Sequence, residues 1–364
     1  MLIGCAPQAQ RLAGPGPGIT PWNAGPAAAV EGPRVRVGLL LPLTGGNGPL
    51  GQSMLNAAQL ALFDQGDRRV EVLPRDTRGT PAGAADAARN LLSQGAVALA
   101  GPLTLGETAA VVSVARASDV PVFAFTSDEA QASARVWVLG LTPGQQVRRV
   151  VAAAAETGTR RFALMAPDDA FGQRLAAALR QSAQLVGAPP PTVVLTPPRG
   201  GDMAAAAAQV AAATPEAVLI GHGGSGARAA GAALAAAFPA GMPKILGTSL
   251  WAADAGIGNE PALVGAWFPA PDPEARGRFD AQYAAAFGDR PTRLTGVAYD
   301  ALALAARTAR DGSPPVGEAF MGADGPVRLL DGGALGRGLA IFAVRQGGEA
   351  QMIQPAPVPG APGS

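Results

Sequence analysis

The chain has 364 residues, of which 48% are hydrophobic and 15% are charged, and its formal net charge is +1. This length suffices for two lobes with a core each, and the charge gives no general attraction to nucleic acid or anionic lipid. One cysteine excludes an internal disulfide, and one histidine beside it argues against a His/Cys metal site.

The first residues contain Leu2-Ile3-Gly4-Cys5, which resembles a bacterial lipobox whose cysteine receives a lipid. A secretory signal has an apolar stretch of roughly 7–15 residues before the cleavage site, whereas only Met1 to Gly4 precede Cys5. The motif therefore predicts a lipid anchor at Cys5. This prediction requires either that translation starts upstream or that Met1 is an internal residue of the precursor. Ala6 follows the cysteine, which in lipoproteins of this kind implies the outer membrane. The alternative is a free cysteine in an unstructured N-terminus.

Residues 6–33 are rich in proline and glycine without a hydrophobic period, so residues 1–33 are predicted to form a lipobox and a tether. Residues 346–364 are predicted to be a disordered tail. Between them, short apolar runs alternate with amphipathic segments. Strands are predicted over 35–41, 70–75, 96–100, 120–125, 162–166, 193–195, 217–221 and 245–246. Helices are predicted over 50–65, 105–117 and 169–186, and after the cap signals Thr80-Pro81 and Thr142-Pro143-Gly144-Gln145.

This alternation is typical of the α/β class with parallel sheets covered on both faces. Two successive runs of it predict two doubly wound lobes. No apolar run reaches the roughly 18–20 residues of a membrane-spanning helix, so the body is expected to be soluble.

Ligands of doubly wound sheets bind beyond the carboxyl ends of the strands, so the loops that follow the strands contain the candidate site. The candidate residues are Thr44, Leu103, Thr104, Phe125, Thr126, Ser127, Asp168, His222, Thr248 and Trp251. Thr104, Thr126 and Ser127 are the strongest, because they precede segments whose N-termini offer free N–H groups to an anion. The same residue types also serve as ordinary helix caps.

The loop Gly221-His222-Gly223-Gly224-Ser225-Gly226 satisfies G-x-G-x-x-G, the pattern of a dinucleotide site. No acidic residue ends the following strand, so a tight turn is the favoured interpretation. As a general base, His222 would need an orienting acid and a nucleophile, and neither can be recognised in the neighbouring sequence. His222 is therefore predicted to be a turn residue that faces the site.

Asp168-Asp169 lies at a strand-to-helix turn, where an N-cap and favourable first-turn charge explain it better than an acid/base pair or a metal site. Trp251 and Trp267 are predicted to pack in the core or hinge, unless one is exposed and forms an interaction surface. No catalytic residue, metal ligand or cofactor is predicted, and an enzyme is the least favoured class.

Residues 35–62, VRVGLLLPLTGGNGPLGQSMLNAAQLAL, resemble the opening of the type I periplasmic binding proteins, the leucine-binding-protein superfamily. The likeness continues at 76–81, 101–103, 120–123, 167–172 and 299–301, and it covers about residues 34–345. It implies two α/β lobes joined by three crossovers that close on a ligand. The crossovers are expected near 140, 249 and 323. The N-lobe then comprises 34–140 plus 250–322, and the C-lobe 141–249 plus 323–345.

Two branches of the superfamily are compatible with these segments. The amino-acid transport branch usually has small hydroxyl residues after Gly-Pro, which bind the α-carboxylate of the ligand. Here residues 103–107 have one hydroxyl, Thr104, and add Glu107, while the next loop adds Asp128. These departures weaken the case for an amino-acid clamp.

Residues 120–151 and the segment around Trp251, Trp267 and Phe268 resemble the other branch, the penicillin-binding protein activators. That branch consists of envelope lipoproteins that stimulate peptidoglycan synthases. The resemblance implies a non-catalytic periplasmic protein, held at the membrane by its lipid alone, whose partner is a class A penicillin-binding protein. The alternative is the substrate-binding protein of an ABC transporter for branched-chain or other amino acids, whose partner is a small polar ligand.

Overall fold

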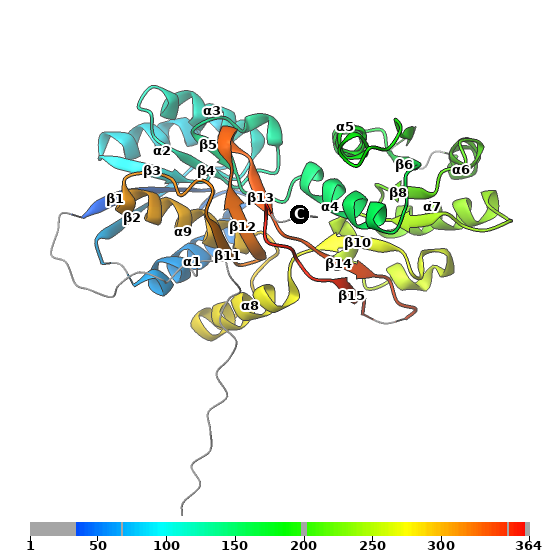
Figure 1. The fold of residues 1–364 in the computed structure, drawn as a ribbon. Helices are drawn as coiled ribbons and strands as arrows, with labels where there is room; N and C mark the ends of the chain where they lie inside the picture. Colours follow the sequence, from blue (N-terminus) through cyan, green and yellow to red (C-terminus); the bar gives the residue numbers. More distant parts are fainter. Residues whose placement is uncertain (1–33, 67, 198–201, 348, 361–364) are drawn as a thin grey trace, which may run out of the picture.

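The computed structural model describes residues 34–66, 68–197, 202–347 and 349–360. The predicted lipobox, with Cys5, and the predicted tether lie outside the described residues. Two α/β lobes lie side by side (Figure 1), so the predicted α/β class with two doubly wound lobes is confirmed.

The N-lobe is built on a five-stranded parallel sheet with the strand order β2-β1-β3-β4-β5. Its strands are β1 (Val35–Leu41), β2 (Val70–Asp76), β3 (Ala96–Ala100), β4 (Val122–Ala124) and β5 (Val136–Val138). The helices that cover it are α1 (Gly48–Gln65), α2 (Pro81–Ser93), α3 (Leu105–Arg116), α8 (Pro273–Phe287) and α9 (Thr295–Asp311). Alternate residues of β1 enter different cores, because side chains alternate across a strand. Leu39 packs with α1 and α9, and Leu40 packs with α2 and α3.

The C-lobe is built on a seven-stranded sheet with the order β15-β14-β10-β9-β8-β6-β7. Its strands are β6 (Phe162–Pro167), β7 (Thr192–Thr196), β8 (Ala217–Ile220), β9 (Lys244–Leu246), β10 (Trp267–Ala270), β14 (Ala340–Ala343) and β15 (Gln351–Gln354). Helices α4 (Pro143–Glu156) and α5 (Ala170–Leu185) share one core, and α6 (Met203–Ala212) and α7 (Gly224–Ala237) share the other. The last two strands, β14 and β15, run antiparallel to their neighbours, which departs from the predicted all-parallel sheet.

A third, small antiparallel sheet consists of β11 (Ala319–Gly322), β12 (Gly325–Leu329) and β13 (Leu335–Arg337). Phe320, Val327 and Leu335 from these strands join the N-lobe core. Short 3₁₀ helices complete the structure: η1 (Glu129–Gln131), η2 (Ser249–Ala253), η3 (Ile257–Asn259), η4 (Pro261–Leu263) and η5 (Asp331–Gly333).

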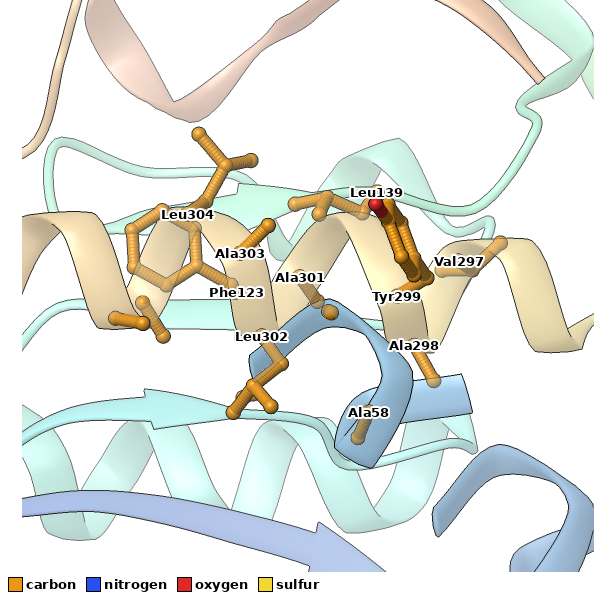
Figure 2. Close-up of a cluster of buried hydrophobic side chains, with 14 of the residues drawn as sticks. Ala58, Phe123, Leu139, Val297, Ala298, Tyr299, Ala301, Leu302, Ala303 and Leu304 are labelled. Carbon is orange, nitrogen blue, oxygen red and sulfur yellow. The ribbon is translucent and has the colours of Figure 1, made fainter. Parts of the chain in front are cut away.

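Helix α9 is buried along most of its length in the N-lobe. Figure 2 shows side chains from Val297 to Leu304 of α9 beside Ala58 of α1 and Phe123 of β4. The Phe123 ring stacks on Trp137 of β5 with centroids 5.4 Å apart. This core fixes the N-lobe strands from which the site loops emerge.

The chain passes between the lobes three times, and two of the passages differ from the expected positions. The first runs through residues 139–142, between β5 and α4. The second was expected near 249, which is wrong because β10 hydrogen-bonds to β9 and β14 of the C-lobe. It follows β10, at residues 271–272. The third was expected near 323, which is also wrong because β11, β12 and β13 pack on the N-lobe core. It lies at residues 338–339.

The predicted disordered tail also needs a correction. Residues 351–354 of the expected tail, 346–364, form the edge strand β15, which pairs antiparallel with β14. The pairing satisfies the backbone groups on one side of this segment, although its side chains are largely exposed.

Candidate functional site

The candidate residues lie at or after the carboxyl ends of strands β1, β3, β4, β6, β8 and β9, as predicted from the strand pattern. Loops from the two lobes meet at these ends. A side-chain nitrogen of Arg174 on α5 lies 3.2 Å from a carboxylate oxygen of Asp128, which follows β4. The Arg293 guanidinium, between α8 and α9, donates to the Ser249 carbonyl oxygen at 3.2 Å. The carboxyl ends of the two sheets therefore face each other across the boundary between the lobes.

Thr44 is tied to an acid that the sequence analysis missed. Its hydroxyl donates to Asp76, at the end of β2, at 2.6 Å, and the backbone N–H groups of Leu43, Thr44 and Arg78 donate to the other carboxylate oxygen. Burial raises the pKa of Asp76, but these hydrogen bonds outweigh it and leave the pKa below its ordinary value. An ionised Asp76 thus holds the β1 loop. Thr44 was chosen because candidate site residues lie at the carboxyl ends of strands, and the same criterion applies to Asp76, which ends the neighbouring strand.

Thr104 is the N-cap of α3 and is bonded to an acid of the same helix. Its hydroxyl and its N–H both donate to one carboxylate oxygen of Glu107, at 2.7 and 3.0 Å, in a capping box. Glu107 is fully buried, and its second carboxylate oxygen has no hydrogen-bond partner among the described residues. In this conformation an internal carboxylate takes the hydroxyl and the N–H of Thr104, and the contact of Thr104 with a ligand stays a prediction. Leu103, just before the cap, is half-buried against the N-lobe core.

The loop after β4 is also occupied by its own side chains. Phe125 is buried in the N-lobe core, and the Thr126 hydroxyl accepts a hydrogen bond from the Asp128 N–H at 3.2 Å. Ser127 is exposed. The Glu129 carboxylate accepts from the Gly144 N–H at 3.1 Å, in the first turn of α4. Two helix N-termini near this loop, those of α3 and α4, thus receive carboxylates of the chain itself.

The C-lobe contributes a neutral polar cluster from the carboxyl ends of β7, β8 and β9. The hydroxyl of Thr196, at the end of β7, lies 3.1 Å from Nε2 of His222, which follows β8. Burial lowers the pKa of His222, and the negative charge of Asp169 only partly opposes this, so the imidazole is neutral at pH 7. The Trp251 indole N–H donates to the His222 carbonyl oxygen at 2.8 Å. Thr248 is 1% exposed, and its hydroxyl has no partner among the described residues.

The structure agrees with the modest roles predicted for the other motifs. Asp169 caps α5 by accepting from the Gly172 N–H at 2.9 Å, while Asp168 is exposed and accepts from Gln173. Trp251 is buried in the C-lobe core, tilted against Phe268, as a packing residue. The Gly221–Gly226 loop forms the turn into α7, with Gly223 as its N-cap.

Within the part of the chain that the structure describes, no three His, Cys, Asp or Glu side chains are grouped to hold a metal. No helix in that part is both long and apolar enough to cross a membrane. The polar groups at the facing strand ends are Thr196, His222 and Thr248 on one lobe and Asp128 on the other, and these four residues are buried, with Asp128 paired to Arg174.

Two lobes joined by three passages, with polar residues at facing strand ends, define a bilobal binding protein. A family model supports this class and narrows it. The chain belongs to the periplasmic binding protein family, whose model matches residues 34–341. Members of this family are in general binding proteins, not enzymes. Among curated proteins, none matches the chain in sequence.

Solved structures share the fold at low identity. A putative branched-chain amino acid ABC transporter protein from Rhodospirillum rubrum has a TM-score of 0.76 and 21% identity, covering 88% of this chain and 100% of that one. The leucine-binding protein LivK from Thermotoga maritima has a TM-score of 0.59 and 19% identity, covering 88% and 98%. Full-length LpoA from Haemophilus influenzae has a TM-score of 0.72 and 18% identity, covering 88% of this chain but 59% of LpoA.

Proposed function

We propose that the chain is a periplasmic lipoprotein that binds a class A penicillin-binding protein and regulates its peptidoglycan synthesis. The observation that carries this proposal is the occupation of helix N-termini by the chain's own carboxylates. Glu107 accepts from the N–H and hydroxyl of Thr104 at the cap of α3, Glu129 bonds to α4, and Asp169 caps α5. A ligand carboxylate needs such N–H groups. A site that has already satisfied them is poorly suited to an amino acid, which favours a protein partner.

The resemblance to the activator branch supports the same conclusion. Residues 120–151, which carry much of it, form β4, η1, β5 and the first half of α4, including the first passage between the lobes. The likeness to LpoA is in keeping with this resemblance. Since the chain spans 59% of LpoA, activities of the whole of that protein are transferred here only as a proposal.

A reconstituted synthesis assay tests the proposal. The full-length chain should bind a purified class A penicillin-binding protein and raise its rate of glycan polymerisation or cross-linking. A monofunctional transpeptidase serves as the control and should show no change. If the class A enzyme neither binds the chain nor changes its rate, the proposal is wrong.

The alternative function is solute capture for an ABC importer of amino acids or related small polar molecules. The likeness to the Rhodospirillum and Thermotoga proteins favours it, since these are described as a putative branched-chain amino acid transporter and a leucine-binding protein. The neutral cluster of Thr196, His222 and Thr248 supports it too, because the hydroxyl of Thr248 has no hydrogen-bond partner among the described residues. A thermal-shift screen of amino acids distinguishes the two functions, because a ligand that binds only the folded state raises its melting temperature.

A variant sharpens that screen. Glu107→Ala removes the internal carboxylate and frees the N–H and hydroxyl of Thr104. If Glu107 is what excludes ligand carboxylates, leucine should raise the melting temperature of this variant but not of the native chain. Glu71→Ala, at a partly exposed site on β2 away from the strand ends, is the matched control. Stabilisation of the native chain by an amino acid would instead favour the importer function.

The lipid anchor and the outer membrane location are part of the proposal, on the strength of the lipobox resemblance. Labelled palmitate should enter the precursor when it is expressed in a bacterial host. Incorporation should disappear in Cys5→Ala. A native precursor that takes up no label would show that Cys5 is not acylated.

A further inference from the structure

A buried cluster of four charged residues lies where the lobes join. Asp300 on α9 and Arg337 at the end of β13 have side chains that are 1% and 2% exposed. Asp324, in the turn between β11 and β12, and Arg276 on α8 complete the cluster, and their side chains are 11% and 18% exposed. With all four groups ionised the cluster has no net charge. Burial of this many charges is costly unless they are paired and hydrogen-bonded.

The cluster touches all three passages between the lobes. The Arg337 guanidinium donates to the Leu139 carbonyl oxygen in the first passage at 2.9 Å. At the second passage, Asp272 donates its backbone N–H to the Asp324 carbonyl oxygen at 2.9 Å. Arg337 itself leads directly into the third passage, through Gly338. A displacement of Arg337 relative to the two aspartates therefore displaces the connections between the lobes.

The backbone on either side of Arg337 is bonded to the C-lobe, although β13 itself packs on the N-lobe core. Gln145 of α4 donates to the Leu335 carbonyl oxygen at 2.8 Å, and Arg149 of α4 donates to the Leu339 carbonyl oxygen at 2.8 Å. Asp300 lies on α9, in the same lobe as β13. A shift of Arg337 relative to Asp300 would therefore move the two carbonyl groups that hold α4, and with them the C-lobe relative to the N-lobe.

The pairing inside the cluster is incomplete. Nη1 of Arg337 lies 3.8 Å from a carboxylate oxygen of Asp300 and 4.0 Å from one of Asp324, too far for a hydrogen bond to either. That oxygen of Asp300 and both Nε and Nη1 of Arg337 have no hydrogen-bond partner among the described residues. A movement of about 1 Å toward one aspartate would make a charge-assisted bond of ordinary length. Arg337 is therefore placed between two alternative partners.

We propose that this cluster is a two-position hinge switch, in which Arg337 moves between Asp300 and Asp324 and thereby sets the orientation of the two lobes. An ionised Asp300 draws Arg337 toward α9. A protonated Asp300 leaves Arg337 to Asp324. Small shifts of this kind are amplified into lobe rotations because packed interfaces have discrete arrangements.

The surroundings of Asp300 make protonation the natural input to this switch. Burial raises its pKa to about 7; Arg337, the Ala323 N–H and Arg276 lower it, and Asp324 raises it further. The neighbouring charged group on the α1 side is Asp64, which accepts from the Tyr299 hydroxyl at 2.8 Å. The cluster can therefore change its charge within the physiological range of pH.

Pulsed electron-resonance distance measurements test the proposal on the full-length chain. Spin labels at Ser113→Cys on α3 and Ala177→Cys on α5, both exposed positions, report the distance between the lobes in a Cys5→Ser background. The mean distance should shift between pH 5.5 and pH 8.5 with a midpoint near 7. Asp300→Asn should keep the low-pH distribution at both pH values. Asp311→Asn, an exposed position on the same helix, should titrate like the native chain.

A second variant distinguishes the switch from a general effect of charge loss. Asp324→Asn removes the charged partner that Arg337 takes when Asp300 is protonated, so the distance should stay near its high-pH value at both pH values. Circular dichroism checks that each variant is folded. A native distance that does not change with pH overturns the proposal. So does a shift that persists unchanged in Asp300→Asn.

Discussion

The buried carboxyl group of Asp300 predicts an unusual dependence of stability on pH. Its pKa is about 7 in the folded chain, whereas the ordinary value, which applies to the unfolded chain, is 3.8. Between these two values the folded state binds the proton and the unfolded state does not. The stability that this group contributes is therefore complete below about pH 4 and is lost as the pH rises to about 7. Asp300→Asn cannot ionise and should not show this loss.

The size of the effect follows from the two pKa values. A difference of about three pKa units corresponds to about 4 kcal/mol over the whole interval, at about 1.4 kcal/mol per unit. Between pH 5 and pH 8 the pH rises through roughly two units below the folded-state pKa. The free energy of unfolding of Asp300→Asn, relative to that of the native chain, should therefore rise by about 3 kcal/mol.

Urea denaturation followed by circular dichroism at pH 5, 6, 7 and 8 measures this difference. The comparison at each pH removes other titrations, including that of His222, whose lowered pKa acts in the opposite direction. Asp311→Asn, whose carboxyl is hydrogen-bonded by Arg310 and has a lowered pKa, should show no such rise. If the native chain and Asp300→Asn change in parallel from pH 5 to pH 8, Asp300 ionises normally and the reasoning fails.

Other substitutions test the packing and the lobe contact. Phe123→Ala should lower the free energy of unfolding by about 3–5 kcal/mol, because its ring is fully buried; a loss below about 1 kcal/mol in urea titrations would contradict the core described. Trp251→Phe should lower it by about 1 kcal/mol through loss of the hydrogen bond to the His222 carbonyl, and an unchanged midpoint would count against that bond. Arg174→Ala removes the ion pair with Asp128 and, since Arg174 is 42% exposed, should change stability by less than about 1 kcal/mol. It should nevertheless broaden the distance distribution between the lobes, and an unaltered distribution would show that the pair does not hold them.

The parallel sheets could be predicted from the sequence because a strand that is buried on both faces appears as a continuous run of apolar residues. The run from Val37 to Leu41 is continuously buried, as the apolar pattern indicated. β10 left no such trace, since it is four residues long and contains Pro269. β15 has exposed side chains between glycines and prolines, so its composition resembles that of a tail. Its order comes from pairing with β14, which local sequence does not encode.

The site was only partly predictable, for a related reason. Strand ends are local features, and the candidate residues lie at or after them. The capping box of Thr104 and Glu107 was also legible in the spacing of the two residues, but Glu107 was interpreted as a charge near a ligand. Its role depends on where the side chain folds back. The pair of Asp128 and Arg174 depends on the orientation of two lobes, which no local pattern specifies.

The occupied helix N-termini and the hinge cluster bear on the same question. In a solute-binding protein, the free energy that closes the lobes comes from ligand contacts that differ between the two states. Where Glu107 already takes the N–H groups, a carboxylate ligand has less to offer, so another input must bias the orientation. Protonation of Asp300 is such an input. A protein partner that contacts both lobes would then bind with a pH dependence that Asp300→Asn abolishes. A partner that contacts one lobe would bind alike at pH 5.5 and pH 8.5, because the surface within a lobe does not change when the hinge moves.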